Sequence, residues 1–158
     1  MFTLNWIPIG AGKLALSHRP PRRVIPMLPS FGVERVVTLL SEKEGGMIVG
    51  LAVQETGLKW SWLPLRNGHY PQGDADKMLR AALPVLSHSL DEGEAILIHC
   101  SAGMHRTGML AFALLRWRGC SEEQALELIE QMRVHTRTGI QKRQIAWGNR
   151  VVADVSKL

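Results

Sequence analysis

Cys100 and Arg106 are the residues of this chain whose types and spacing indicate chemistry most directly. Cys100 ends the apolar run AILIHC, and Arg106 follows six positions later in HCSAGMHRTG. Residues 101–106 supply six backbone N–H groups and lead into a sequence with helical spacing. A helix N-terminus carries unpaired donors and a partial positive charge, so it attracts an anion. The spacing therefore predicts an anion-binding loop with a cysteine at its floor.

The side chains of this loop fit a tetrahedral oxyanion such as phosphate. The guanidinium of Arg106 is a planar fork that matches two oxygens of the anion. Gly103 can adopt backbone angles that other residues avoid, as a tight loop requires. The same positive field favours the thiolate form of Cys100, and a thiolate that faces a bound phosphate is placed for phosphoryl transfer. We expect the cysteine to attack, the loop to hold the phosphate and the arginine to clamp it.

The pattern His99-Cys100, five residues, Arg106-Thr107-Gly108 resembles the signature of the protein tyrosine phosphatases, HCxxGxxRTG. Within that superfamily the chain resembles the compact dual-specificity group, especially bacterial members and phosphatases of the cyclin-dependent-kinase-inhibitor type. Three further segments resemble that group: a strand and acidic turn at 35–45, the general-acid loop at 62–68, and a segment beside the phosphate loop at 137–144.

The resemblance implies a phosphatase that hydrolyses phosphotyrosine, phosphoserine or phosphothreonine of proteins through a phosphocysteine on Cys100. Arg106 would bind the phosphate and the transition state, Thr107 would donate a hydrogen bond to the Cys100 sulfur, and His99 would support the loop. The phosphate would be bound at Ser101, Ala102, Gly103, Met104, His105 and Arg106. No cofactor or metal is expected, since a loop whose donors point inward suits an anion and opposes a cation.

The general acid is the one role that the sequence leaves open. The segment that resembles the acid loop has Asn67 where an aspartate is usual, and an amide cannot donate a proton as a carboxylic acid can. Asp74 is our first candidate, because it lies nearest to that loop among the four aspartates of the chain. Asp76 and His69 are further candidates, and acid-free chemistry is a fourth possibility. Both aspartates fit equally well as helix-start residues, where negative charge is favoured.

Two other functions fit parts of the pattern. Asn67 in place of the usual acid would suit a phosphate-binding module without turnover, although pure binding needs no nucleophile such as Cys100. A sulfurtransferase also places a cysteine before a helix, but the Arg106-Thr107-Gly108 sequence disfavours that interpretation.

Strand and helix patterns alternate around the loop. The chain shows strand patterns at 5–9, 13–16, 34–40, 58–65 and 95–98, and helical patterns at 74–90, 104–119, 121–134 and about 140–152. Residues 22–32 fit a short helix or turn, and residues 46–57 are ambiguous because glycines weaken their helical spacing. This order predicts an α/β fold with a central, mostly parallel sheet flanked by helices and the phosphate loop between a strand and a helix.

Composition sets the remaining expectations. A chain of 158 residues predicts a single domain over residues 1–158. The net charge of +5 favours an anionic partner, a phosphorylated protein or a small phosphate ester. We expect no nucleic-acid partner, because aromatic residues do not interleave the basic clusters, and no membrane partner, because no apolar run approaches a bilayer span. A cytoplasmic location is expected, because the chain shows no secretory signal and a reactive thiolate suits a reducing compartment.

Overall fold

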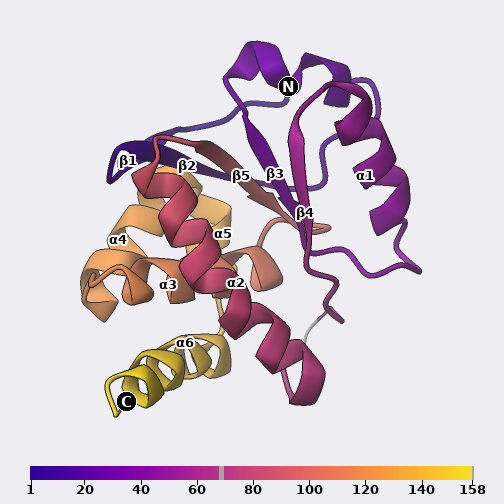
Figure 1. Ribbon diagram of the computed structural model, residues 1–158. Coiled ribbons are helices and arrows are strands. Elements are labelled where there is room, and N and C mark those ends of the chain that lie inside the picture. Colours follow the sequence, from indigo (N-terminus) through magenta and orange to yellow (C-terminus); the bar gives the residue numbers. More distant parts are fainter. Residues whose placement is uncertain (68–69, 158) are drawn as a thin grey trace.

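The computed structural model describes residues 1–67 and 70–157, and it consists of a five-stranded sheet with helices packed against both faces (Figure 1). In chain order the elements are β1 (Ile7–Ile9), β2 (Gly12–Ser17), η1 (Ile25–Phe31), β3 (Arg35–Thr38), α1 (Gly46–Glu55), β4 (Lys59–Trp62), α2 (Gly73–Asp91), β5 (Ala95–His99), α3 (His105–Trp117), α4 (Glu122–Met132), α5 (Val134–Gly139) and α6 (Lys142–Val155). The spatial order of the strands is β1-β2-β5-β3-β4.

The strand β5 lies at the centre of the sheet and sets the position of the loop that follows it. It pairs in parallel with β2 on one side and β3 on the other, and both partner strands reach His99 in register, at Ser17 and Thr38. All five residues of β5 are buried. A continuous apolar run is what a strand covered on both faces requires. The carboxyl ends of three parallel strands therefore meet where Cys100 begins the loop.

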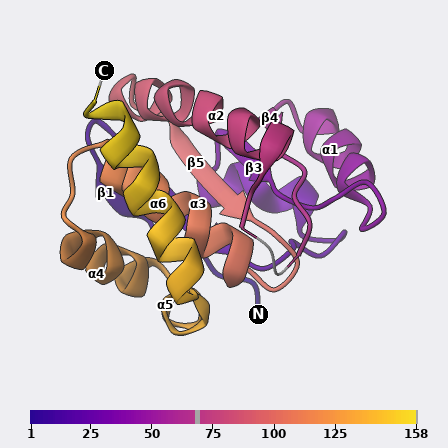
Figure 2. The same ribbon diagram turned by 90° about the horizontal axis from the view of Figure 1, so that it is seen from below.

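Two hydrophobic clusters hold helices on opposite faces of the sheet. One cluster includes buried residues of α2, α3, α4 and α6, and the other joins η1 and α1 to the sheet. Figure 2 shows α6 lying across α3, with α2 alongside them. Gly148 allows this close packing, because a Cβ there would collide with the ring of Phe112. The α3 helix is thus enclosed, with every residue from Arg106 to Leu115 buried.

The predicted α/β architecture is confirmed, and the two uncertain segments are settled. Residues 46–57 contain the helix α1, in which Gly50 makes room for the Trp60 side chain. Residues 25–31 form the 3-10 helix η1. The short helix α5 was not predicted, because its six residues carry too little periodicity to distinguish them from a turn.

Candidate active site

Cys100 lies at the floor of a loop between β5 and α3. Its side chain is buried, at 3% exposure, whereas Ser101 and Ala102 above it are exposed. The carbonyl of Ser101 accepts a hydrogen bond from the backbone N–H of Arg19 at 2.9 Å, which ties the loop to the end of β2. In the described part of the chain, the backbone N–H groups of residues 101–104 donate to no protein acceptor. The loop therefore presents a set of free donors above a buried sulfur.

Gly103 turns the loop and closes it against its neighbours. Its φ of +71° lies in the left-handed region, and a Cβ there would collide with the carbonyl of Ser17. The carbonyl of Gly103 accepts hydrogen bonds from Arg133 Nη1, at 3.0 Å, and from Thr136 Oγ1. The loop carbonyl thus faces outward to α5 and its N-terminal flank, which leaves the N–H side of the loop open for a ligand.

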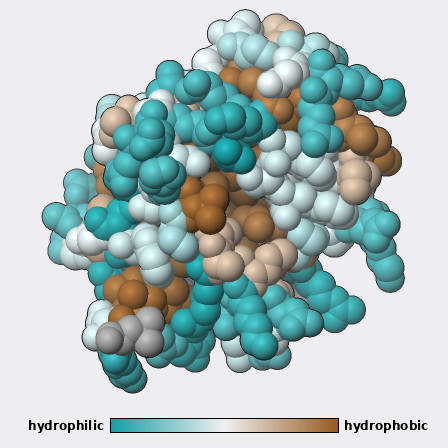
Figure 3. Space-filling model, in the orientation of Figure 1, coloured by the Kyte–Doolittle hydropathy of each residue, from teal (hydrophilic) through white to brown (hydrophobic). Residues whose placement is uncertain are grey.

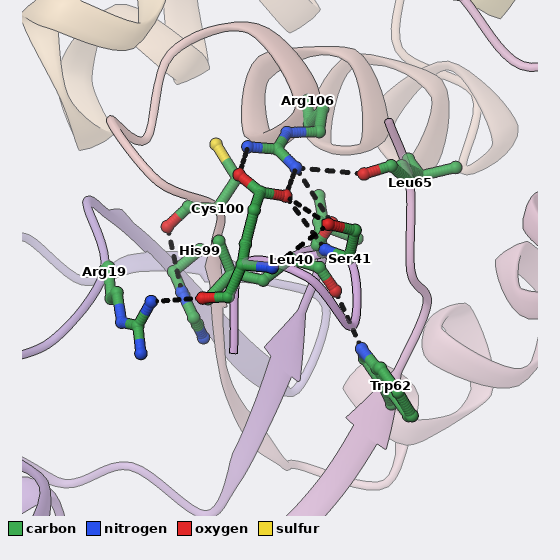
Figure 4. Close-up of polar contacts among 10 residues, drawn as sticks. Arg19, Leu40, Ser41, Trp62, Leu65, His99, Cys100 and Arg106 are labelled. Atoms are coloured by element: carbon green, nitrogen blue, oxygen red, sulfur yellow. Dashed lines mark hydrogen bonds and ion pairs between the residues drawn. The ribbon is translucent and has the colours of Figure 1, made fainter. Parts of the chain in front are cut away.

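Arg106 is fully buried and is held by a carboxylate from a distant segment. Glu44 accepts hydrogen bonds from Arg106 Nη1 at 2.6 Å and from Nη2 at 3.0 Å, in a two-point ion pair (Figure 4). The carbonyl of Leu65 accepts a further bond from Nη1 at 3.0 Å. The Nε atom is buried without a partner in the described structure. One edge of the guanidinium is therefore fixed by protein, and the other retains a donor for an anion.

Glu44 is itself held in place by the turn that follows β3. Its Oε1 accepts hydrogen bonds from the backbone N–H of Ser41 at 2.9 Å and from Ser41 Oγ at 3.0 Å. The hydrogen bond from Arg106 is the main cause that lowers the pKa of Glu44 to about 2, with the bonds from Ser41 adding to it against the effect of burial. Glu44 is therefore ionised across the physiological pH range. Figure 4 shows the Cys100 sulfur on the same side as the Arg106 guanidinium.

His99 supports the loop from beneath as a neutral residue. Burial lowers its pKa to about 4. A neutral ring has one N–H, and Nδ1 lies 3.1 Å from the Cys100 carbonyl, which can only accept. This contact assigns the proton to Nδ1, so that Nε2 accepts from Thr38 Oγ1 at 2.8 Å. Thr38 accepts in turn from Trp60 Nε1 at 2.9 Å, and the chain of bonds runs from β4 through β3 to the loop.

Thr107 donates no hydrogen bond to the Cys100 sulfur in this structure. Its Oγ1 is buried and has no hydrogen-bond partner in the described structure, the Cys100 sulfur included. A buried hydroxyl without a partner costs free energy, so a ligand or a shift of the loop that supplied one would be favoured. Thr107 is thus positioned inside the site with its hydrogen-bonding capacity unused.

The structure separates the two aspartate candidates for the general acid. Asp76 already has hydrogen-bond partners. Its carboxylate accepts hydrogen bonds from Arg80 Nε at 3.0 Å and from Trp147 Nε1 at 2.7 Å. Asp74 is exposed in the first turn of α2, with no side-chain partner in the described structure. The flanking residues Gln72 and Ala75 line a hollow of about 390 Å³ that also includes Leu65, whose carbonyl binds Arg106.

The other two positions considered for proton transfer are Asn67 and His69, and neither is a carboxylic acid. Asn67 is exposed in the turn after β4. His69 lies outside the described residues.

Three residues of the site were missed from the sequence: Glu44, Arg19 and Arg133. The acidic turn at 35–45 was the available signal for Glu44, but it did not specify which of its glutamates points inward. Arg19 and Arg133 act through the loop carbonyls of Ser101 and Gly103, and such contacts leave no pattern in sequence. Residues 137–144 do reach the loop, as predicted, since a Cβ at Gly139 would collide with Met104.

Within residues 1–67 and 70–157, no three His, Cys, Asp or Glu side chains lie close enough together to hold a metal ion. In the same residues, no helix has the length and apolar character needed to cross a bilayer.

A cysteine after a central parallel strand and a buried arginine in the first turn of the next helix define the class of cysteine-dependent phosphatases. A model of the tyrosine phosphatase family matches residues 25–128, more than half of the chain. The chain belongs to the tyrosine phosphatase family. No curated protein sequence matches it significantly.

Solved structures show the same fold at low sequence identity. Kinase associated phosphatase, with its catalytic cysteine changed to serine, has a TM-score of 0.75 at 19% identity, over 98% of this chain and 94% of its own. PTPMT1 in complex with PI(5)P has a TM-score of 0.76 at 18% identity, over 97% of each chain. The core catalytic domain of the PP-IP phosphatase SIW14 from S. cerevisiae has a TM-score of 0.70 at 17% identity, over 99% of this chain and 91% of its own. The fold is that of the compact dual-specificity phosphatases.

Proposed function

We propose that the protein hydrolyses phosphomonoesters of phosphotyrosine, phosphoserine or phosphothreonine in proteins through a phosphocysteine at Cys100. The observation that carries this proposal is the set of unused donors around the sulfur. It comprises the loop N–H groups of residues 101–104 and the buried Nε of Arg106. The buried Nε of Arg106 is costly without a partner, and a phosphate bound above Cys100 would satisfy it together with the loop N–H groups.

In the first step the Cys100 thiolate attacks phosphorus. The S–P bond forms as the P–O bond to the substrate breaks, and the departing oxygen takes a proton. Arg106 and the loop N–H groups stabilise the charge on the three equatorial oxygens, where positioned donors contribute most. Glu44 acts through Arg106, since it fixes the guanidinium without touching the phosphate.

In the second step water attacks the phosphocysteine. A P–O bond forms to the water oxygen, the S–P bond breaks, and Cys100 leaves as a thiolate while inorganic phosphate is released. Thr107 Oγ1 has no partner in the described structure, and a shift of the loop would let it donate to the departing sulfur. The water loses its proton to the group that protonated the first leaving group.

Asp74 is the group that we assign to proton transfer. Its carboxylate is exposed and has no side-chain partner in the described structure. Its neighbours Gln72 and Ala75 line a hollow that also includes Leu65, whose carbonyl binds Arg106. Asp76 is excluded from the role by its bonds to Arg80 and Trp147.

The loop composition favours protein substrates over highly charged phosphates. Two similar structures are associated with other phosphates: PTPMT1 is in complex with PI(5)P, and SIW14 is a PP-IP phosphatase. In this chain, Met104 and His105 stand in the loop where further lysines would attract several phosphates. A single phosphate monoester needs only the donors already described. We place the enzyme in the cytoplasm, where reducing conditions keep the thiolate active.

An assay of the purified protein with nitrophenyl phosphate, and with thiosulfate and cyanide, tests this proposal. We expect phosphate release and no thiocyanate. Thiocyanate formation would indicate a sulfurtransferase. Tight phosphate binding with no hydrolysis of either substrate would indicate the binding module that Asn67 suits.

A further inference from the structure

An apolar groove lies between η1 and α1, on the face of the sheet opposite to α3. Its volume is about 840 Å³. Among its lining residues, Ile48 and Leu51 of α1 are 65% and 56% exposed, which is unusual for large apolar side chains. Figure 3 shows the apolar surface over α1 at the right of the molecule. Contiguous exposed apolar surface commonly marks an interaction site.

Arg19 links the groove to the phosphate loop. This residue lines the groove, and its backbone N–H donates to the Ser101 carbonyl at 2.9 Å. Its Nη1 donates to the backbone carbonyl of Glu44 at 2.5 Å, and its guanidinium lies against Gly45, directly before α1. A chain that leaves the phosphate loop past Arg19 therefore enters the groove at the start of α1.

The length of the groove fits a short extended peptide. The ten residues of α1 rise about 1.5 Å each, so the helix is about 15 Å long. An extended chain advances about 3.3 Å per residue, so about five residues would lie along it. Because Ile48 and Leu51 remain more than half exposed, the surface suits a peptide laid across it better than a small molecule, which binding sites usually enclose.

The charges of the groove define which peptide would fit. Arg19 and Arg22 line it and pair with no carboxylate in the described part of the chain. Glu55 lines it as well, at the C-terminal end of α1. An acidic residue is thus favoured near the phosphorylated residue, followed by aliphatic residues. An anionic membrane fits less well, since Glu55 in the lining would repel it.

We propose that this groove binds the segment flanking the phosphorylated residue of a protein substrate, about five residues with an acidic residue first and aliphatic residues after it. This inference rests on the proposed phosphatase function. The phosphate loop selects the phosphomonoester, and the groove selects the sequence around it. The groove affects substrate binding and leaves the chemistry at Cys100 unchanged.

Three phosphotyrosine peptides test the proposal: one with an acidic and aliphatic five-residue flank on the N-terminal side, one with it on the C-terminal side, and one with neither. We expect one flanked peptide to have a kcat/KM about tenfold above that of the unflanked peptide, which corresponds to about 1.4 kcal/mol. The substitution Leu51→Glu should remove this preference through KM. The matched control Val85→Glu, at a 60% exposed valine on α2, should keep it.

A charge exchange makes the test specific to the arginines. Arg22→Glu should lose the preference for the acidic flank and gain one for the same peptide with lysine in the acidic position. None of these variants should change the rate with nitrophenyl phosphate. Equal kcat/KM values for all three peptides, or equal losses in Leu51→Glu and Val85→Glu, would overturn the proposal.

Two further measurements keep this inference separate from the proposed function. If nitrophenyl phosphate is not hydrolysed, the proposed function fails, but fluorescence anisotropy with the Cys100→Ser protein still shows whether flanked peptides bind more tightly than the unflanked one. Sedimentation with phosphatidylcholine vesicles, with and without phosphatidylinositol phosphate, tests the membrane alternative. If vesicles bind, Leu51→Glu abolishes that binding and no peptide is preferred, the ligand of the groove is a membrane and not a peptide.

Discussion

At the scale of single residues, the site depends on the pair formed by Arg106 and Glu44. A buried guanidinium is costly unless a carboxylate and hydrogen bonds compensate it. Glu44 supplies both and leaves Nε free. The pair therefore sets the orientation in which Arg106 meets the phosphate, before any substrate binds.

Glu44→Gln should damage both stability and activity. The substitution leaves the Arg106 charge buried with a neutral partner, and breaking a buried pair costs about 3–5 kcal/mol. We expect the lower end, because the Glu44 side chain is 30% exposed. Urea unfolding and kcat/KM with nitrophenyl phosphate measure the two effects. Glu42→Gln, at an exposed glutamate of the same turn, is the control, and equal behaviour of the two variants would show that the pair has no special role.

Asp74→Asn should reduce activity in a way that depends on the leaving group. General acid catalysis usually contributes about 10²–10⁴-fold, and a nitrophenolate needs little of it. We expect a large loss with a phosphopeptide and a small one with nitrophenyl phosphate. Asp76→Asn should instead lower the unfolding free energy, because it removes the charge that pairs with Arg80 and leaves one acceptor oxygen for Arg80 and Trp147. Near-native rates of Asp74→Asn on both substrates would remove this residue from the mechanism.

At the scale of elements, the loop is shaped as much by its neighbours as by its own sequence. The ends of β2 and β3 and the N-terminal side of α5 all contact the turn from His99 to Gly103. Gly103 is the point at which these contacts leave no space for a side chain.

Gly103→Ala should abolish activity and cost more stability than the backbone strain alone. Its Cβ would have to displace the Ser17 carbonyl, so the loop N–H groups would lose their arrangement. Gly119→Ala is a matched control, since Gly119 also has a positive φ, +99°, but open space around it. Both variants should lose about 1 kcal/mol from backbone strain, and only Gly103→Ala should lose turnover. Full activity of Gly103→Ala would contradict the close fit of the loop.

The local parts of the site could be predicted from the sequence, and the distant contacts could not. The strand before Cys100 and the helix after it follow from hydrophobic spacing, and the loop between them follows from its residue types. The pairing of Glu44 with Arg106 joins residues 62 positions apart, so it depends on the order of strands in the sheet. The helix α1 was left ambiguous for a related reason. Glycine occupies position 50 of this helix because the Trp60 side chain of β4 needs the space, and not because glycine favours a helix.

At the scale of the whole molecule, His99 joins the centre of the sheet to the catalytic loop. Its ring bonds to Thr38 and the Cys100 carbonyl, and burial keeps it neutral near pH 7. The ordinary pKa of 6.5 falls to about 4 in the folded protein because of burial. The unfolded chain thus takes up a proton at a higher pH than the folded chain does.

The unfolding free energy should decrease as the pH falls from about 6.5 to about 4, because the unfolded state alone gains the His99 proton in that range. Above pH 6.5 the histidine contributes no slope. A second decrease should follow between about 4.5 and 2, where Glu44 is protonated only in the unfolded state. Urea unfolding across this range measures both. His99→Asn should flatten the first decrease, and an unchanged slope in that variant would contradict the assignment.

The phosphocysteine at Cys100 is the central claim, and trapping it is the most direct test. A phosphotyrosine peptide labelled in its phosphate is mixed with the enzyme, the reaction is quenched in acid during turnover, and the digested protein is examined by mass spectrometry. We predict a phosphoryl group on the peptide that contains Cys100, and its absence in Cys100→Ser, which should still bind phosphate through the loop and Arg106. Continued turnover by Cys100→Ser, or phosphate release with no label on Cys100, would contradict the account.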